Sequence, residues 1–352
     1  MLNRSRNRDR SRFGGGAPAA LPSFIAVAHR TTPFVSAYPW SASGFGTIFS
    51  DPGTLPTGDG YGVAFTASGD AIAVAHDTTP FVSAYPWSIS GFGTKFSNPG
   101  TLPAGIGWGV AFTASGNAIA VAHNGSPYVS AYPWSGSGFG TKFSDPGTIP
   151  TGSGYGVAFT AAGNAIAVGH DNTPFVSAYP WSGSGFGTKF SNPSGLVNDG
   201  NGVAFTASGN AIAIAHVNSP YVSAYPWSGS GFGTKFSNPG ILPTGNGNGV
   251  AFTASGNAIA VAHPNSPRVS AYPWSGSGFG TKFSDPGILP EGDGNGVAFT
   301  AASNAIAMSH SGPALTTPRV SAYPWSGSGF GTKFSDPGTI PTGIGQGVAF
   351  SN

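Results

Sequence analysis

The sequence repeats itself seven times, and this repetition constrains the fold more than any other feature. The tripeptide Tyr-Pro-Trp recurs at intervals of 46 to 51 residues. Two further markers, a single His and a Gly-Val-Ala-Phe segment, also occur seven times each. Near-identical units of similar length are the signature of a repeat architecture, in which each unit packs against its neighbours. The tripeptides end at Trp40, Trp87, Trp134, Trp181, Trp227, Trp274 and Trp325.

Each repeat reads as four short strands. In the third repeat the strands are expected at residues 109–113, 118–123, 128–134 and 139–143, where large and small side chains alternate. The segments between them are rich in Gly, Asn, Ser and Pro, the residues that favour turns. Four antiparallel strands in each unit of this length are typical of one blade of a β-propeller. The sequence therefore predicts an all-β, seven-bladed β-propeller with four-stranded blades.

The second strand of each repeat predicts how the blades pack. In residues 118–123, Ile119, Val121 and His123 share one face, and three alanines share the other. Small side chains on one blade would leave room for large side chains of the next blade.

The two ends of the chain predict how the ring closes. The first repeat begins at its second strand, residues 24–29, and the chain ends with a first strand at 347–352. We expect the C-terminal strand to complete the N-terminal blade, which removes an open sheet edge. The expected organisation is an arm and linker at residues 1–20 followed by the propeller at 21–352.

The repeat resembles a blade of the WD-repeat family. Val-Ala-Phe-Thr-Ala-Ser-Gly at 110–116 is similar to that family's first strand and turn. Val-Ser-Ala-Tyr-Pro at 129–133 resembles its third strand, with Tyr132 where Trp usually stands and Pro133 where Asp usually stands. The family's Gly-His before the first strand and its constant Asp are absent. The resemblance implies a platform for protein interactions.

Composition excludes several classes of protein. The chain has no Cys, which excludes a disulfide scaffold, a Cys-ligated zinc site and a thiol nucleophile. Abundant aromatic residues with only 7% charged residues are unlike a disordered chain. No apolar run approaches the roughly 18 residues of a membrane span, and no secretory signal is recognisable. We expect a virion or cytoplasmic protein without a cofactor.

The repeats differ mainly in two loops, the turn after each His and the connection before each Gly-Val-Ala-Phe segment. Strand alternation puts both loops on one side of the disc. The last position of the connection should ring the mouth of the central channel, and its aromatic and amide side chains suit a glycan or a receptor. The alternative is neutral drift in exposed loops. The candidate binding residues are Tyr61, Trp108, Tyr155, Asn201, Asn248, Asn295 and Gln346.

The histidines and the acidic corners are expected to be structural. Each His lies in its own blade, so the ring nitrogens are too far apart for a shared metal. We expect each to bond a neighbouring Tyr hydroxyl or a backbone carbonyl. At the Ser-Asp/Asn-Pro corner, Asp and Asn interchange, which a turn tolerates and a catalytic or cation-binding carboxylate does not. No catalytic residue and no metal site is predicted.

The N-terminal arm holds all of the chain's excess positive charge. Residues 1–12 carry a net charge of +4, whereas the rest of the chain carries −2. Such an arm could dock on proteins of an assembly or on nucleic acid, and the alternative is a solvated end. The arm's basic residues are Arg4, Arg6, Arg8, Arg10 and Arg12.

Together these features favour a non-enzymatic structural, adhesion or protein-interaction propeller. We expect it to belong to a larger assembly such as a phage virion, near the capsid or tail, and to dock through its arm. A multivalent lectin with up to seven sugar sites between blades is the alternative. A propeller hydrolase or lyase is less favoured, because no nucleophile or paired-carboxylate pattern occurs.

Overall fold

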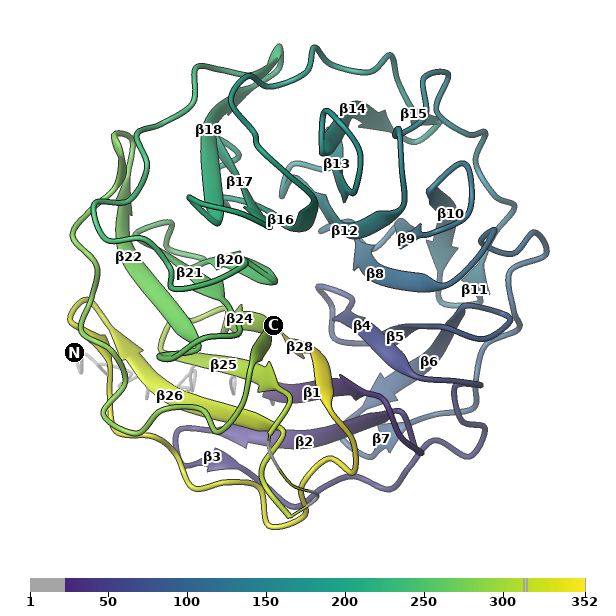
Figure 1. The fold of residues 1–352 in the computed structure, drawn as a ribbon. Coiled ribbons are helices and arrows are strands. Elements are labelled where there is room, and N and C mark those ends of the chain that lie inside the picture. Colours follow the sequence, from purple (N-terminus) through teal and green to yellow (C-terminus); the bar gives the residue numbers. More distant parts are fainter. Residues whose placement is uncertain (1–22, 313, 315, 352) are drawn as a thin grey trace, which may run out of the picture.

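Each repeat folds into one four-stranded antiparallel sheet in the computed structural model, which describes residues 23–312, 314 and 316–351. The seven sheets stand around a central axis as the blades of a propeller (Figure 1). The described residues contain strands and turns but no helix. The fold predicted from the repeats is therefore confirmed.

The strands occupy four equivalent positions in each blade, from the central channel outward. The innermost strands are β4 (Gly60–Phe65), β8 (Gly107–Phe112), β12 (Gly154–Phe159), β16 (Gly200–Phe205), β20 (Gly249–Phe252), β24 (Gly294–Phe299) and β28 (Gly345–Phe350). The second strands are β1 (Ser23–His29), β5 (Ala71–His76), β9 (Ala118–His123), β13 (Ala165–His170), β17 (Ala211–His216), β21 (Ala258–Ala262) and β25 (Ala305–His310). The third strands are β2 (Val35–Ser41), β6 (Val82–Ser88), β10 (Val129–Ser135), β14 (Val176–Ser182), β18 (Val222–Ser228), β22 (Val269–Ser275) and β26 (Val320–Ser326). The outermost strands are β3 (Gly44–Phe45), β7 (Gly91–Phe92), β11 (Gly138–Phe139), β15 (Gly185–Phe186), β19 (Gly231–Phe232), β23 (Gly278–Phe279) and β27 (Gly329–Phe330).

The outermost strand is much shorter than the sequence predicts. In the third blade it covers two residues, Gly138–Phe139, instead of 139–143. The chain leaves the ladder there, although the Gly140 and Phe143 amides still donate single bonds to carbonyls of β10. A short outermost strand limits the open edge that each blade offers to other chains.

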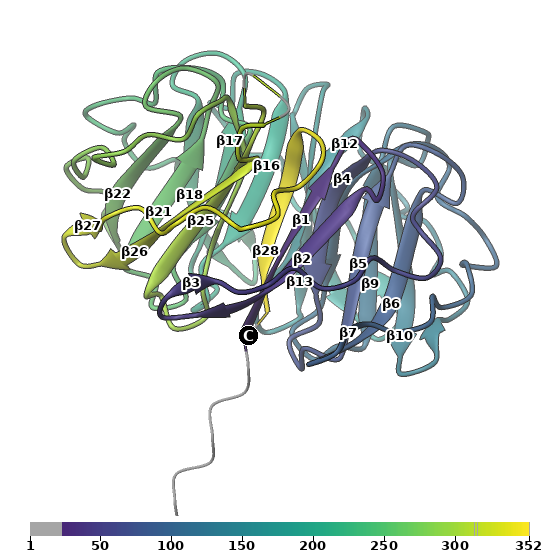
Figure 2. The same ribbon diagram turned by 90° about the horizontal axis from the view of Figure 1, so that it is seen from below.

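The ring closes through the two ends of the described chain. β28 pairs antiparallel with β1, with Ala349 opposite Ala26 and Val348 opposite Val27. The Phe24 amide donates to Ser351 Oγ at 2.9 Å, which extends the contact by one residue. Figure 2 shows β28 in yellow beside β1 in purple. The predicted closure of the N-terminal blade by the C-terminal strand is confirmed.

The hydrophobic core consists of seven equivalent layers, one between each pair of neighbouring blades. Ala120 and Ala122 of β9 pack against Val168 and Trp181 of the next blade. The Trp181 ring also meets Phe143 of the preceding repeat edge to face at 5.2 Å. Such aromatic pairs add to the stabilisation from burial. The small-against-large packing predicted from the alternating faces is what holds the blades together.

A buried tyrosine in each third strand ties down the connection between blades. Tyr132 is completely buried, and its hydroxyl donates to the Thr101 carbonyl at 2.8 Å. The other six repeats make the equivalent bond. The long Pro/Gly connection is thus anchored at the same point in every repeat, which positions the residues that enter the innermost strands.

Candidate functional site

The seven variable positions before Gly-Val-Ala-Phe come together around one cavity at the centre of the disc. They lie at or next to the start of the innermost strands, so each blade contributes one side chain. The cavity has a volume of about 300 Å³. We call this ring of side chains the rim; it consists of Tyr61, Trp108, Tyr155, Asn201, Asn248, Asn295 and Gln346.

A glycine next to each rim residue lets neighbouring blades approach closely. A Cβ atom on Gly109 would lie 2.6 Å from the Tyr155 carbonyl oxygen of the next blade. A Cβ atom on Gly62 would lie 2.8 Å from the Trp108 carbonyl oxygen. Real Cβ atoms do not come so close to backbone oxygen, so Gly62 and Gly109 cannot be replaced without a shift of the backbone. The rim is narrow because these glycines bring the innermost strands together.

Three aromatic side chains form one side of the rim. The Tyr61 and Trp108 ring centroids are 4.2 Å apart, and those of Trp108 and Tyr155 are 5.9 Å apart. The Trp108 Nε1 atom is buried and has no hydrogen-bond partner among the described residues. Partial burial raises the pKa of the Tyr61 and Tyr155 hydroxyls, so both stay protonated at neutral pH. This aromatic arc offers ring faces and hydroxyl groups to a ligand.

Amide side chains form the opposite side of the rim. Three asparagines use Nδ2 to donate a hydrogen bond to a backbone carbonyl of the next blade. The bonds join Asn201 to Gly247 (2.9 Å), Asn248 to Gly294 (2.9 Å) and Asn295 to Gly345 (2.8 Å). Each Oδ1 atom has no partner among the described residues, and an amide oxygen can accept two bonds. This amide arc therefore presents hydrogen-bond acceptors.

The two variable loops of each repeat meet around the rim, as the sequence predicts. Thr57 Oγ1 of one connection donates to the Thr79 carbonyl of the turn after His76, at 2.7 Å. The Asp77 amide of that turn donates to the Asp59 carbonyl. We call the end of the disc that carries these loops the variable face, and the opposite end the constant face.

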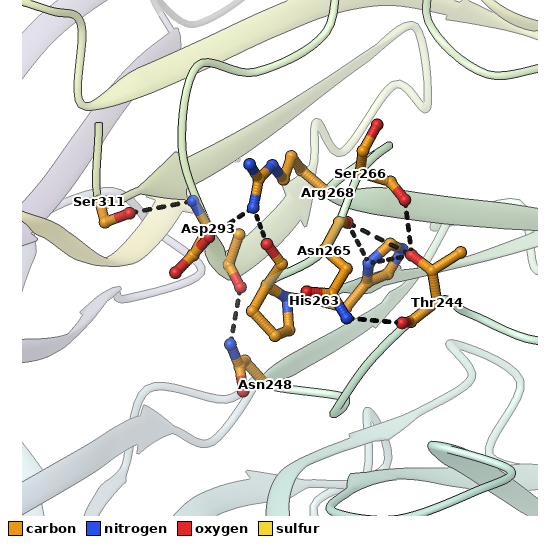
Figure 3. A network of polar contacts seen from close by, with 10 residues as sticks. Thr244, Asn248, His263, Asn265, Ser266, Arg268, Asp293 and Ser311 are labelled. Carbon is orange, nitrogen blue, oxygen red and sulfur yellow. Dashed lines mark hydrogen bonds and ion pairs between the residues drawn. The ribbon is translucent and has the colours of Figure 1, made fainter. Parts of the chain in front are cut away.

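Next to the amide arc, side chains of two neighbouring repeats bridge the loops (Figure 3). Arg268 Nη1 pairs with Asp293 Oδ1 at 2.5 Å and also donates to the Pro264 carbonyl. The Asp293 amide donates to Ser311 Oγ at 2.9 Å. Exposed pairs of this kind contribute about 0–1 kcal/mol, so this network orders the loops more than it stabilises the fold.

The seven histidines are buried inside the blades and do not face the rim. His123 Nε2 lies 3.0 Å from Ser130 Oγ of the neighbouring strand, and every other His has the equivalent serine. The predicted Tyr hydroxyl partner is wrong, because the tyrosines bond the connections instead. A carbonyl partner occurs at Nδ1 of His216 and His263. In the described part of the chain, no three His, Asp or Glu side chains gather as metal ligands.

The Asp/Asn corners use only a side-chain oxygen, as their interchange predicts. In six repeats a lysine donates Nζ to the Oδ1 atom three residues later, as Lys142 does to Asp145 and Lys235 to Asn238. An amide oxygen and a carboxylate oxygen both accept this bond. The first repeat has Ile48 in place of the lysine. These lysines lie beyond the end of the two-residue outermost strand.

Three further cavities open between neighbouring blades on the constant face. The largest, about 520 Å³, lies between the seventh and first blades and is lined by Trp40, Asn304 and Pro324. Cavities of about 310 and 280 Å³ occupy the equivalent places on either side of the fifth blade. Sequence reasoning missed their lining residues, because they belong to the turns that hardly vary. The only sequence signal for them is the repetition itself.

The arm residues Arg4, Arg6, Arg8, Arg10 and Arg12 lie outside the described residues. Within residues 23–312, 314 and 316–351, no helix is long and apolar enough to cross a membrane.

Comparison with known proteins supports the fold alone. No model of a protein family matches the chain, and no curated protein matches it in sequence. A protein from Lactobacillus plantarum superposes with a TM-score of 0.70 at 15% identity, over 94% of this chain and all of that one. A protein from Bacteroides uniformis described as a "putative 6-phosphogluconolactonase" superposes with a TM-score of 0.69 at 11% identity, over 94% of this chain and 99% of that one. The resemblance to WD-repeat blades stays a prediction.

Proposed function

We propose that the protein is a non-enzymatic interaction propeller that binds a ligand or partner at the rim. One observation carries this proposal: the positions at which near-identical innermost strands differ are the positions that line one cavity. Within each innermost strand, the Gly and Val-Ala-Phe positions on either side of the rim residue do not change. On the constant face, the turns also stay almost the same in all repeats.

The chemistry of the rim favours binding over catalysis. Its seven side chains are Tyr, Trp, Asn and Gln, and both tyrosine pKa values are raised, so these groups keep their protonation state around pH 7. General acid–base catalysis needs a group with a pKa near the working pH. The histidines are buried between strands and have lowered pKa values.

A propeller hydrolase is the competing proposal. Two solved structures with a similar fold are each described as a "putative 6-phosphogluconolactonase", which is the reason to consider it. A phosphorylated sugar lactone carries negative charge and would need cations at the site. Two arginines of the variable face are already engaged, Arg30 over the Tyr61 ring and Arg268 with Asp293. Incubating the protein with such a lactone and measuring its hydrolysis is the direct assay. Hydrolysis by the wild type that is lost in the Trp108→Ala variant would favour the hydrolase.

The lectin is a second candidate, and the cavities between blades favour it. Three of them occupy equivalent places and combine a tryptophan with asparagine and serine side chains. Aromatic rings and amides are suited to stacking on and bonding sugars. A lectin of this kind would bind several glycans per chain on the constant face and would be insensitive to changes in the rim.

Binding to glycan and peptide arrays, followed by titration calorimetry, tests the proposal. The Tyr61→Ala/Trp108→Ala double variant should weaken rim binding at least tenfold. Ile89→Gly is the matched control, because Ile89 is exposed on the constant face where several other repeats have glycine. Equal binding of the wild type and the double variant to every probe would refute a rim function. The setting in a phage virion stays a prediction from the repeat pattern.

A further inference from the structure

The rim has the chemistry of a receptor for cations. On the amide arc, three side-chain NH₂ groups donate to backbone carbonyls, and the Oδ1 atoms stay available as acceptors. These side chains are Asn201, Asn248 and Asn295. On the aromatic arc, ring faces attract cations through their quadrupoles. One cation of the chain already uses this arc, because the Arg30 guanidinium lies 5.3 Å from the centroid of the Tyr61 ring.

Carboxylates lie beside the aromatic arc: Asp59 and Asp77 act on Tyr61, and Asp171 and Asp199 act on Tyr155. Among the described residues, the loops of the variable face carry ten acidic side chains, six lysines and three arginines, and the lysines and four of the acidic side chains belong to the Asp/Asn corners. Arg268 is paired with Asp293, and the Nη atoms of Arg319 donate to three loop carbonyls, so both guanidinium groups are held by this chain's own loops. The acidic residues outside the Asp/Asn corners are Asp59, Asp77, Asp171, Asp199, Glu291 and Asp293.

The chain contains a segment that is complementary to this surface. Residues 1–12 hold five arginines at every second position, and one Asp. The described chain begins at Ser23, and β1 runs from there to His29 on the variable face, so the arm joins the disc on the constant face. β1 spans about 23 Å, whereas 22 residues of extended chain reach about 70 Å.

We propose that the Arg-rich arm of one copy binds the rim of a second copy stacked on its constant face. Arginine side chains would lie on the rings of Tyr61, Trp108 and Tyr155 and donate to the free Oδ1 atoms of the amide arc. Because the arm joins the disc on the face opposite the rim, a contact between two copies is head-to-tail and can continue from copy to copy. This inference rests on the rim being a binding site, and it names the partner.

Sedimentation velocity of the full-length chain tests the assembly. The wild type should associate with concentration, and raising the salt from about 50 to 500 mM should weaken association at least tenfold. A variant with the five arm arginines changed to Gln should have an association constant at least tenfold lower. The Tyr61→Ala/Trp108→Ala variant should show a loss of the same size. The control changes five lysines of the Asp/Asn corners to Gln, which removes the same charge without changing the arm or the rim. Its association constant should not fall below that of the wild type. Those lysines are Lys142, Lys189, Lys235, Lys282 and Lys333.

Titration with a synthetic peptide of residues 1–16 identifies the contact. The receptor is the full-length arm variant, whose own arm no longer competes, and the rim double change in that background should cost at least tenfold in affinity. If the peptide binds the arm variant equally well with and without the rim double change, the proposal is overturned. It is also overturned if the wild type stays monomeric with its own arm bound to its own rim. If the peptide fails to bind but a sugar binds and depends on Trp108, this inference falls and the proposed function stands. Arm binding to single-stranded DNA that ignores the rim changes also overturns it.

Discussion

Acidification below pH 6.5 should unfold the propeller, because its buried histidines are held neutral. All seven have no exposed surface. Burial lowers the pKa of His29, His76, His123, His170 and His263 from 6.5 to about 4, and burial also lowers that of His310, to about 3. In five of the seven, the Nδ1 atom makes no hydrogen bond among the described residues. At four of these, a nearby backbone group offsets part of the effect of burial, and burial remains the larger contribution.

The magnitude follows from proton linkage. The unfolded chain takes up a proton at each His near pH 6.5, whereas the folded chain takes it up only near pH 4, so stability is complete above 6.5 and falls as the pH drops toward 4. At pH 5 the loss is about 2 kcal/mol for each histidine, since one pKa unit is worth about 1.4 kcal/mol. Six such residues give about 12 kcal/mol, comparable to the whole unfolding free energy of a typical domain.

Urea unfolding followed by tryptophan fluorescence at pH 8, 7, 6, 5.5 and 5 measures this loss. Most carboxylates titrate near pH 4, so the window from 6.5 to 5 isolates the histidines. The slope at pH 5 should correspond to about five protons taken up on unfolding. An unfolding midpoint that stays flat from pH 8 to pH 5 would falsify the view that burial keeps these imidazoles neutral.

Three further changes test the packing. Gly109→Ala puts a Cβ atom 2.6 Å from the Tyr155 carbonyl, so it should destabilise the ring by about 1–3 kcal/mol, measured by urea unfolding; no loss would mean the strands can spread. Tyr132→Phe removes the bond to Thr101 and should cost about 1 kcal/mol, and an unchanged midpoint would show the anchor to be unimportant. Asp145→Asn should change stability by less than about 0.5 kcal/mol, because three other repeats use Asn there; a larger loss would assign the charge a role.

Most of this fold is predictable from the sequence because the same weak pattern occurs in seven repeats. One strand such as β9 is ambiguous by itself, but the same alternation in seven copies leaves little choice. The incomplete first and last repeats likewise predicted the pairing of β1 with β28. The errors were local: the outermost strand ends after Phe139, and the partner of His123 is Ser130. Alternation along one strand does not say which side chain of the next strand lies opposite.

The sequence by itself determined the blade count, the closure of the ring and the set of positions that vary. These depend on spacing along the chain, which is visible without coordinates. Only the tertiary structure decided what the variable positions do together. It alone shows that the nitrogens of Asn201, Asn248 and Asn295 are spent on the next blade while their oxygens stay free. Hydrogen bonds between blades depend on atomic positions in two neighbouring sheets, and residues 46 to 50 apart in the chain meet there only when those sheets pack side by side.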